Sequence, residues 1–164
     1  MSDFRVGYGE DIHRLVPGRK LVLAGVKIPF DLGLDGHSDA DVVYHAVSDA
    51  LLGALGLGDI GKYFPPDDPS ITGIDSLLIV KKCLSLVKER DYHVNNVDVS
   101  ILAEEPKMAP WISEMKANLA LALEIKESQS SIKAMTNEGL DAVGKGEAIK
   151  AICLLSLVKD EPTL

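Results

Sequence analysis

Apolar and polar positions along the chain follow two different periods, and these periods predict a succession of strands and helices. Residues 4–13 alternate between apolar and polar side chains, which is typical of a strand with one buried face. Residues 20–30 ("KLVLAGVKIPF") predict a β-hairpin that turns at Ala24 and Gly25, and the stretch over residues 31–36 ("DLGLDG") predicts a loop.

The rest of the chain predicts three helices and three further strands. Residues 38–55 carry apolar side chains at helical intervals, and Ser38 precedes Asp41 by the three residues of a capping box. This helix is expected to end at the glycines Gly56 and Gly58. The other predicted elements are helices over residues 74–90 and 109–125, and strands over residues 94–104, 131–138 and 147–159. Helices and strands do not alternate strictly, so the order favours an α+β sandwich over a doubly wound parallel sheet.

Composition and charge narrow the class of protein. The 164 residues fit a single domain, 1–164, and a composition of 46% hydrophobic and 26% charged residues is typical of a globular protein. The chain has no run near the roughly 18 apolar residues of a membrane span and no recognisable targeting segment. We therefore expect a cytoplasmic protein without a membrane partner, or a mature form whose targeting segment is absent from this chain. Cys83 and Cys153 lie in apolar stretches, which predicts buried free thiols.

The formal net charge of −8 argues against a nucleic-acid partner, because binding a phosphate backbone needs a cationic face. An anionic small molecule fits this chain only if local cations or metal ions offset its negative field.

The glycines that follow the helix predicted over residues 38–55 resemble nucleotide-binding motifs only superficially. Gly56, Gly58 and Gly61 match G-x-G-x-x-G, and Lys62 extends the match toward a P-loop. Both motifs need a preceding strand, whereas a helix precedes this stretch, and Tyr63 stands where a P-loop has Ser or Thr. We interpret these glycines as a helix-terminating turn.

The helix over residues 38–55 carries the strongest chemical signal. His37, Asp41, His45 and Asp49 recur every four residues and therefore form one stripe on a helix. The flanking positions are apolar, and the helix has no basic side chain besides histidine. Four potential metal or phosphate ligands thus share one face, although solvated aspartates beside a structural histidine remain the alternative interpretation.

Asp11 and His13 supply the partners for that stripe. In a strand, residues two apart project from the same face. A carboxylate and an imidazole from the strand, with the imidazole of His45, would make a mixed N and O set of three ligands. Zn²⁺ prefers such donors, and three protein ligands leave a fourth position for water or substrate. Asp41 and Asp49 are predicted to orient the imidazoles by accepting their hydrogen bonds.

Several ordered motifs resemble those of a known enzyme family. "GYGEDIH", "HSDADVVYHAVSDALLGALGLGDIGKYFP", "AEEPKM" and "TNEGL" together resemble the 2-C-methyl-D-erythritol 2,4-cyclodiphosphate synthases of the non-mevalonate isoprenoid route, and the match runs essentially end to end. The resemblance implies a ferredoxin-like sandwich with helices on one face of a mixed β-sheet, assembled as a homotrimer with active sites between subunits. It also implies a phosphorus–oxygen lyase that converts 4-diphosphocytidyl-2-C-methyl-D-erythritol 2-phosphate to the cyclic diphosphate and releases CMP.

Carried over position by position, the resemblance implies two metal sites and a substrate pocket. One Zn²⁺ per site would bind the carboxylate and two imidazoles singled out above, and Glu138 would bind a Mg²⁺ or Mn²⁺ that bridges the substrate diphosphate. His37 and Thr136 would stabilise the transition state. Residues 103–109 would hold the cytosine through their main chain. The substrate-binding residues implied are Ser38, Asp59, Ile60, Gly61, Ala103, Pro106, Lys107, Met108, Ala109, Thr136, Asn137 and Lys145.

Three positions depart from the family pattern, and two other functions remain open. Pro66 stands where an aspartate is common, and Ala142 and Lys145 stand where many members have an aromatic residue and an arginine. Lysine keeps the charge but loses the bidentate fork, which predicts altered phosphate binding. The open alternatives are a zinc-dependent phosphoesterase that activates water, and a non-catalytic oligomer in which zinc only joins strand to helix.

Overall fold

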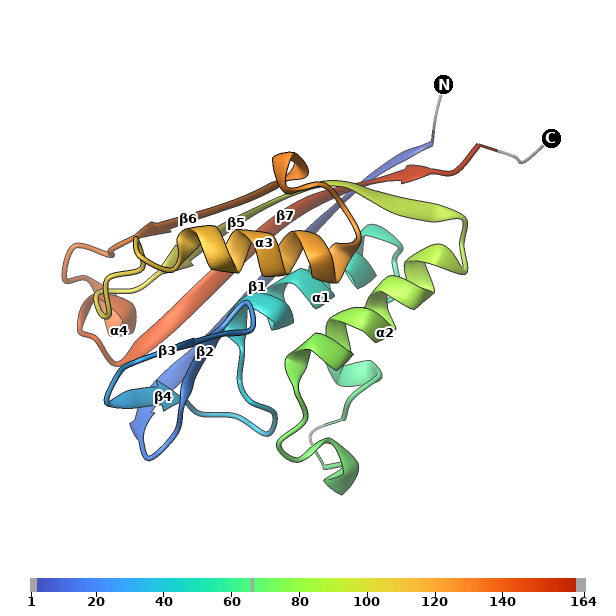
Figure 1. Cartoon of the computed structure of the whole chain (residues 1–164). Helices are drawn as coiled ribbons and strands as arrows, with labels where there is room; N and C mark the ends of the chain where they lie inside the picture. Colours follow the sequence, from blue (N-terminus) through green and yellow to red (C-terminus); the bar gives the residue numbers. More distant parts are fainter. Residues whose placement is uncertain (1–2, 66, 162–164) are drawn as a thin grey trace.

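The computed structural model describes residues 3–65 and 67–161 and is built around one mixed β-sheet (Figure 1). The strand order is β4-β1-β7-β5-β6, in which β5 and β6 are parallel and the other neighbours are antiparallel. The strands are β1 (Phe4–Pro17), β4 (Leu32–Leu34), β5 (Tyr92–Leu102), β6 (Ser130–Met135) and β7 (Ala148–Lys159). A separate hairpin contains β2 (Leu21–Leu23) and β3 (Val26–Ile28).

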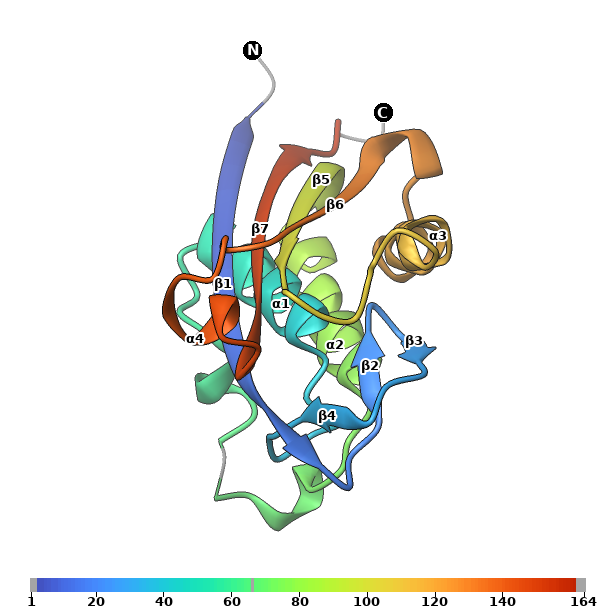
Figure 2. The ribbon, with the colours of Figure 1, turned by 90° about the vertical axis from the view of Figure 1, so that its left-hand side faces the viewer.

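Three helices lie on one side of this sheet (Figure 2). They are α1 (Val42–Ala54), α2 (Ser76–Lys88) and α3 (Ile112–Leu123). The shorter helices are η1 (Ile60–Lys62), η2 (Pro69–Ile71), η3 (Glu127–Gln129) and α4 (Asp141–Gly144). The predicted α+β class is therefore confirmed. Both cysteines are free and buried, as the apolar sequence around them predicts. Within the described part of the chain, no helix is long and apolar enough to cross a membrane.

The three predicted long helices and the predicted strands all form, with shifted ends. Ala24 and Gly25 have φ of 47° and 74°, the left-handed geometry of a two-residue hairpin turn, so the predicted turn is confirmed. The expected loop over residues 31–36 instead contains β4, which pairs with the far end of β1. Sequence alone missed this strand because its three residues are too few to establish a period.

The start of α1 differs from the prediction. Its N-cap is Asp41, whose side chain accepts hydrogen bonds from the backbone N–H groups of Val43 and Tyr44. The hydroxyl of Ser38 lies outside the helix and faces other polar side chains. His37 therefore belongs to the loop before α1 and not to the helical stripe that the four-residue spacing predicts.

Strand β1 has one face toward α1 and one face open. Gly7 and Gly9 lie on the covered face, where a Cβ atom would stand only 1.9 Å from the carbonyl oxygens of Ala50 and Ala46, respectively. Glycine at these two positions lets the strand and helix backbones approach more closely than side chains would allow. The open face carries exposed apolar side chains on β1 and β7, namely Val6, Tyr8, Ile12 and Leu154.

Candidate active site

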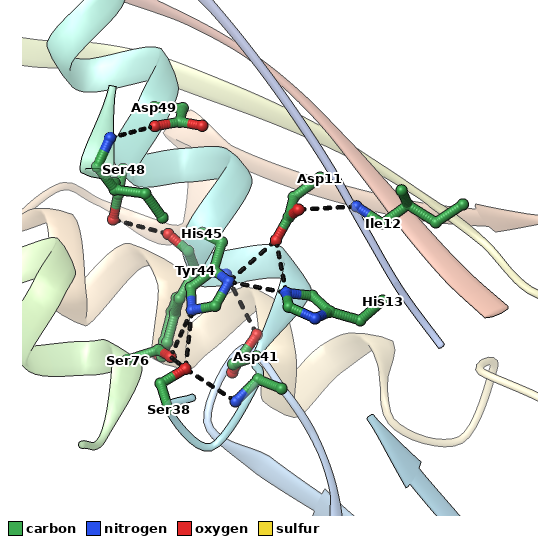
Figure 3. Close-up of polar contacts among 12 residues, drawn as sticks. Asp11, Ile12, His13, Ser38, Asp41, Tyr44, His45, Ser48, Asp49 and Ser76 are labelled. Carbon is green, nitrogen blue, oxygen red and sulfur yellow. Dashed lines mark hydrogen bonds and ion pairs between the residues drawn. The ribbon is translucent and has the colours of Figure 1, made fainter. Parts of the chain in front are cut away.

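Asp11, His13 and His45 converge where β1 crosses α1 (Figure 3). Asp11 Oδ2 lies 2.8 Å from His13 Nε2 and 2.9 Å from His45 Nδ1, and the two imidazole nitrogens are 3.1 Å apart. The strand places the first two side chains on its covered face, and the close approach of α1 brings the third to them. The predicted convergence of these three residues is confirmed.

These donor atoms fit a small divalent metal ion. A tetrahedral ion bonded at about 2.0–2.2 Å holds its ligand atoms roughly 3.3–3.6 Å apart, which is slightly wider than the triangle seen here. Two imidazole nitrogens and one carboxylate oxygen are the donors that Zn²⁺ commonly takes, and they occupy three of four tetrahedral positions. The His45 side chain is buried, whereas Asp11 and His13 are half-buried at the mouth of a pocket.

Hydrogen bonds within this cluster also shift the pKa values of Asp11 and His13. Burial disfavours the carboxylate of Asp11, but hydrogen bonds to His13 and His45 outweigh burial and hold its pKa well below the usual range. Burial likewise disfavours the charged form of His13, yet the hydrogen bond and charge of Asp11 raise the pKa of His13 above its ordinary value. Without metal, the neighbouring carboxylate of Asp11 therefore favours the protonated form of His13.

Zinc affinity should consequently fall in acid. His13 must be deprotonated to bind metal, so lowering the pH through its raised pKa should weaken binding by up to about tenfold per pH unit. The folding stability of the metal-free protein should depend on pH in the opposite sense. The raised pKa of the histidine stabilises the fold at pH values below the pKa of the unfolded state, and this stabilisation is lost as the pH rises through the pKa of the folded state. Zinc titration against a competing chelator from about pH 5.5 to about pH 8 measures the first effect. A flat affinity profile would contradict it.

Other groups than those predicted orient the imidazoles. His13 Nδ1 lies 2.5 Å from the backbone carbonyl of Asp35, which leaves Nε2 free to face the metal position. His45 Nε2 lies 3.0 Å from the hydroxyls of both Ser38 and Ser76. A carbonyl and two hydroxyls thus stand where carboxylates were expected.

Asp41 and Asp49 have different roles from the predicted one. The fully buried carboxylate of Asp41 accepts backbone hydrogen bonds from Ala24 and Gly25, in addition to those that cap α1, and so ties the β2–β3 hairpin to the helix. Asp49 Oδ1 accepts from the N–H of Ile60 at 2.8 Å and fixes the start of η1. Their spacing from His45 is helical, but both side chains point to backbone donors on neighbouring loops.

A pocket of about 250 Å³ opens beside the three converging residues. His37, Ser38, Ile60 and Gly61 line it, together with the partly buried ring of Phe64. Four predicted substrate or catalytic residues therefore line the pocket that contains the candidate metal position. Asp59 caps η1 by accepting from Lys62 at 3.3 Å, which shapes the turn that carries Ile60 and Gly61.

A second pocket, also of about 250 Å³, lies beyond the ends of β5 and β6. Among the predicted substrate residues it gathers Ala103, Pro106, Lys107, Met108, Ala109 and Thr136. Asn137 and Glu138 follow on the same loop, where Thr136 Oγ1 donates to Glu138 Oε1 at 3.2 Å. Lys145 follows this loop along the chain and is the C-cap of α4. In the described ranges the two pockets share no lining residue.

Sequence alone missed three residues that hold these loops. Ser76, the first residue of α2, reaches the imidazole of His45. Arg19 donates to the carbonyls of Gly36 and Ser38, on both sides of His37. Glu104 accepts from the backbone N–H of Asn137 at 2.9 Å, although its sequence context indicates a solvated charge. Each contact joins segments distant in sequence, so no local pattern could have revealed it.

The fold and the site define an α+β protein with a candidate metal centre between a strand and a helix, one pocket beside that centre, and a second pocket beyond the ends of β5 and β6. A model of the YgbB family matches residues 4–158, and the chain belongs to this family.

Curated and solved relatives agree with this assignment. The chain is 52% identical over 157 residues to a 2-C-methyl-D-erythritol 2,4-cyclodiphosphate synthase from Moorella thermoacetica, covering 96% of each chain. Among solved structures, the CDP complex of IspF from Plasmodium falciparum has a TM-score of 0.86 and 32% identity, covering 98% of this chain and 99% of that one. The bifunctional IspDF from Campylobacter jejuni has a TM-score of 0.94 and 34% identity, and 98% of this chain spans 44% of that longer protein.

Proposed function

We infer that the chain converts 4-diphosphocytidyl-2-C-methyl-D-erythritol 2-phosphate to 2-C-methyl-D-erythritol 2,4-cyclodiphosphate and releases CMP. The observation that carries this inference is the convergence of Asp11, His13 and His45 beside a pocket, in a chain whose relatives bear the name of that synthase. One catalytic domain over residues 1–164 would then suffice. Such an enzyme acts in the non-mevalonate isoprenoid pathway, and we place it in the cytoplasm.

The reaction needs positioning and charge neutralisation more than proton transfer. The 2-phosphate oxygen attacks the β-phosphorus of the same molecule, a bond forms between them, and the bond from the β-phosphorus to the CMP oxygen breaks. A phosphate oxyanion is already ionised near neutral pH, so no general base is required. A bound Zn²⁺ would supply positive charge at the phosphoryl oxygens.

The chain's own residues would hold the two ends of the substrate. His37 lies exposed at the pocket mouth, where its imidazole can donate to a phosphate oxygen. Residues 103, 104 and 106–109 line the second pocket, where their main chain would bind the cytosine. The Plasmodium falciparum relative was solved as a CDP complex, which supports a cytidine-linked substrate. Thr136 lines that pocket and donates to Glu138; the hydroxyl would contact the diphosphate and the carboxylate would bind a Mg²⁺ or Mn²⁺ ion.

Ser38, Asp59 and Lys145 keep their predicted roles as substrate contacts in this proposal. Ser38 Oγ accepts from the N–H of Ala40 and also meets His45 and Ser76 Oγ, so a contact with phosphate would take the place of one of these. Lys145 would present a single ammonium in place of a guanidinium fork. Pro66 lies outside the described residues.

We also propose that three copies of the ferredoxin-like subunit assemble as a homotrimer. The open sheet face exposes 57% of Tyr8 and 50% of Leu154, which pair across β1 and β7. A group of exposed apolar side chains on a sheet is the kind of surface that another subunit covers. The metal-site pocket and the cytosine pocket of one chain share no lining residue, so a site assembled from two neighbouring subunits accounts for both.

The test is a product assay with the natural substrate, Zn²⁺ and Mg²⁺. We expect CMP and the cyclic diphosphate to form in equal amounts, which ³¹P NMR and chromatography measure. An opened phosphomonoester in place of the ring would contradict cyclisation and support a zinc-dependent phosphoesterase. Loss of assembly on chelation without any turnover would support a purely structural metal.

A further inference from the structure

A chain of hydrogen bonds leads from His45, away from the metal position, to the carboxylate of Asp39 (Figure 3 shows its His45, Ser38 and Ser76 part). His45 Nε2 lies 3.0 Å from Ser76 Oγ, and Ser76 Oγ donates to Asp39 Oδ1 at 2.5 Å. Ser38 Oγ lies 3.0 Å from the same ring nitrogen and 3.2 Å from Ser76 Oγ. His45 and both serines are buried, so protein groups set the direction of these hydrogen bonds.

The carboxylate at the end fixes that direction. An ionised carboxylate only accepts hydrogen bonds, so the single hydroxyl proton of Ser76 is directed to Asp39. Ser76 Oγ can then only accept from His45, and Nε2 of the neutral imidazole carries the hydrogen. The other ring nitrogen, Nδ1, keeps its lone pair. Nδ1 is the atom that faces Asp11 and His13.

We propose that Asp39 and Ser76 are positioning residues that hold His45 in the tautomer and orientation that bind the metal. The proposal rests on the metal site of the proposed function and adds two residues to it. Hydrogen-bond partners behind a metal-binding histidine fix the ring and raise its basicity as a ligand.

The backbone holds the carboxylate of Asp39 in place for this role. Asp39 N–H donates to the carbonyl of Ile74 at 3.0 Å, and its two oxygens accept from the N–H groups of Asp41 and Ser76. A carboxylate tied to both α1 and α2 cannot swing away from the serine without breaking these contacts.

Capping of α2 does not explain the hydroxyl of Ser76. The N-cap of α2 is Asp75, whose side chain accepts from the N–H of Leu77 at 2.9 Å. Ser76 is completely buried, and its hydroxyl contacts Ser38, Asp39 and His45. A buried hydroxyl is retained at a cost unless its hydrogen bonds compensate, and here they connect an imidazole to a carboxylate.

The experiment measures the zinc dissociation constant of the full-length protein by competition with a chromogenic chelator. Ser76→Ala and Asp39→Asn should each weaken zinc binding by about 10–100-fold. The double variant should bind zinc about as weakly as the single variant with the lower affinity, because both changes interrupt one chain of hydrogen bonds. Thermal unfolding of the metal-free variants separates this effect from a loss of folding.

Ser48→Ala is the matched control. Ser48 is a completely buried serine of α1 whose hydroxyl donates to the carbonyl of Tyr44 at 2.7 Å, away from both imidazoles (Figure 3). Its zinc affinity should equal that of the wild type even if its stability falls. If Ser76→Ala and Asp39→Asn kept the wild-type zinc affinity, the positioning role of Ser76 and Asp39 would be overturned. The metal site itself would stand. If Asp11→Asn bound zinc as tightly as the wild type, the metal site would be overturned, and with it the positioning role of Ser76 and Asp39.

Discussion

Replacing His45 with alanine is expected to abolish zinc binding at the site and to lower the rate of CMP release by at least about 10³-fold. The variant loses one of only three converging ligands, and the remaining pair, Asp11 and His13, can satisfy each other at 2.8 Å. Metal stabilisation of phosphoryl charge amounts to several kcal/mol, and each 1.36 kcal/mol changes a rate about tenfold. Metal analysis of the purified variant and a CMP-release assay measure the two effects.

His93→Ala provides the matched control for this experiment. His93 is an exposed histidine at the start of β5, paired with Asp160 at 2.5 Å and remote from the metal position. Exposed pairs of this kind contribute about 0–1 kcal/mol, so this variant should keep its zinc and its turnover. Full turnover by a zinc-free His45→Ala protein would refute the proposed role of the metal.

Gly9→Ala is expected to destabilise the fold by about 3 kcal/mol or more, which makes it the largest stability effect that we predict. The new Cβ would stand 1.9 Å from the carbonyl oxygen of Ala46 and 2.8 Å from the N atom of Ala50, both in the backbone of α1. Backbone atoms cannot rotate away as a side chain can, so β1 and α1 must separate. Since that contact also brings His45 to Asp11, zinc affinity should fall with stability.

Gly53→Ala tests whether the effect comes from the close contact or from losing a glycine. Gly53 is an exposed residue of α1, and its Cβ would meet the carbonyl oxygen of Tyr8 at an ordinary 3.6 Å. Alanine is favoured over glycine in a helix by up to about 1 kcal/mol, so this variant should be as stable as the wild type or more stable. Thermal unfolding compares the two variants, and equal stability would contradict the steric argument.

Local patterns predicted the long elements and the candidate metal ligands because both depend on short-range geometry. Alternation along β1 places Asp11 and His13 on one face whatever the rest of the chain does. The apolar spacing of α1 and the turn at Ala24 and Gly25 are equally local. The resemblance to a family added the predicted substrate residues, and the structure gathers most of them into two pockets.

The same local reasoning failed where a side chain chooses between several partners. Asp41 and Asp49 have the helical spacing expected for imidazole partners, yet both accept from backbone N–H groups of loops distant in sequence. Ser38 was expected to cap α1, but a nearer carboxylate, Asp41, takes that position. Helical spacing says which residues share a face and does not say which donor lies opposite.

The sequence by itself determined that a carboxylate and two imidazoles would be available on one strand face and one helix. Only the tertiary structure decided that they meet, because the meeting depends on Gly7 and Gly9 letting two backbones approach. Tertiary structure also decided the tautomer of His45 through Ser76, which α2 delivers from 31 residues further along the chain. Hydrogen bonds act over about 3 Å in space whatever the separation in sequence, so such partners become visible only when the chain is folded.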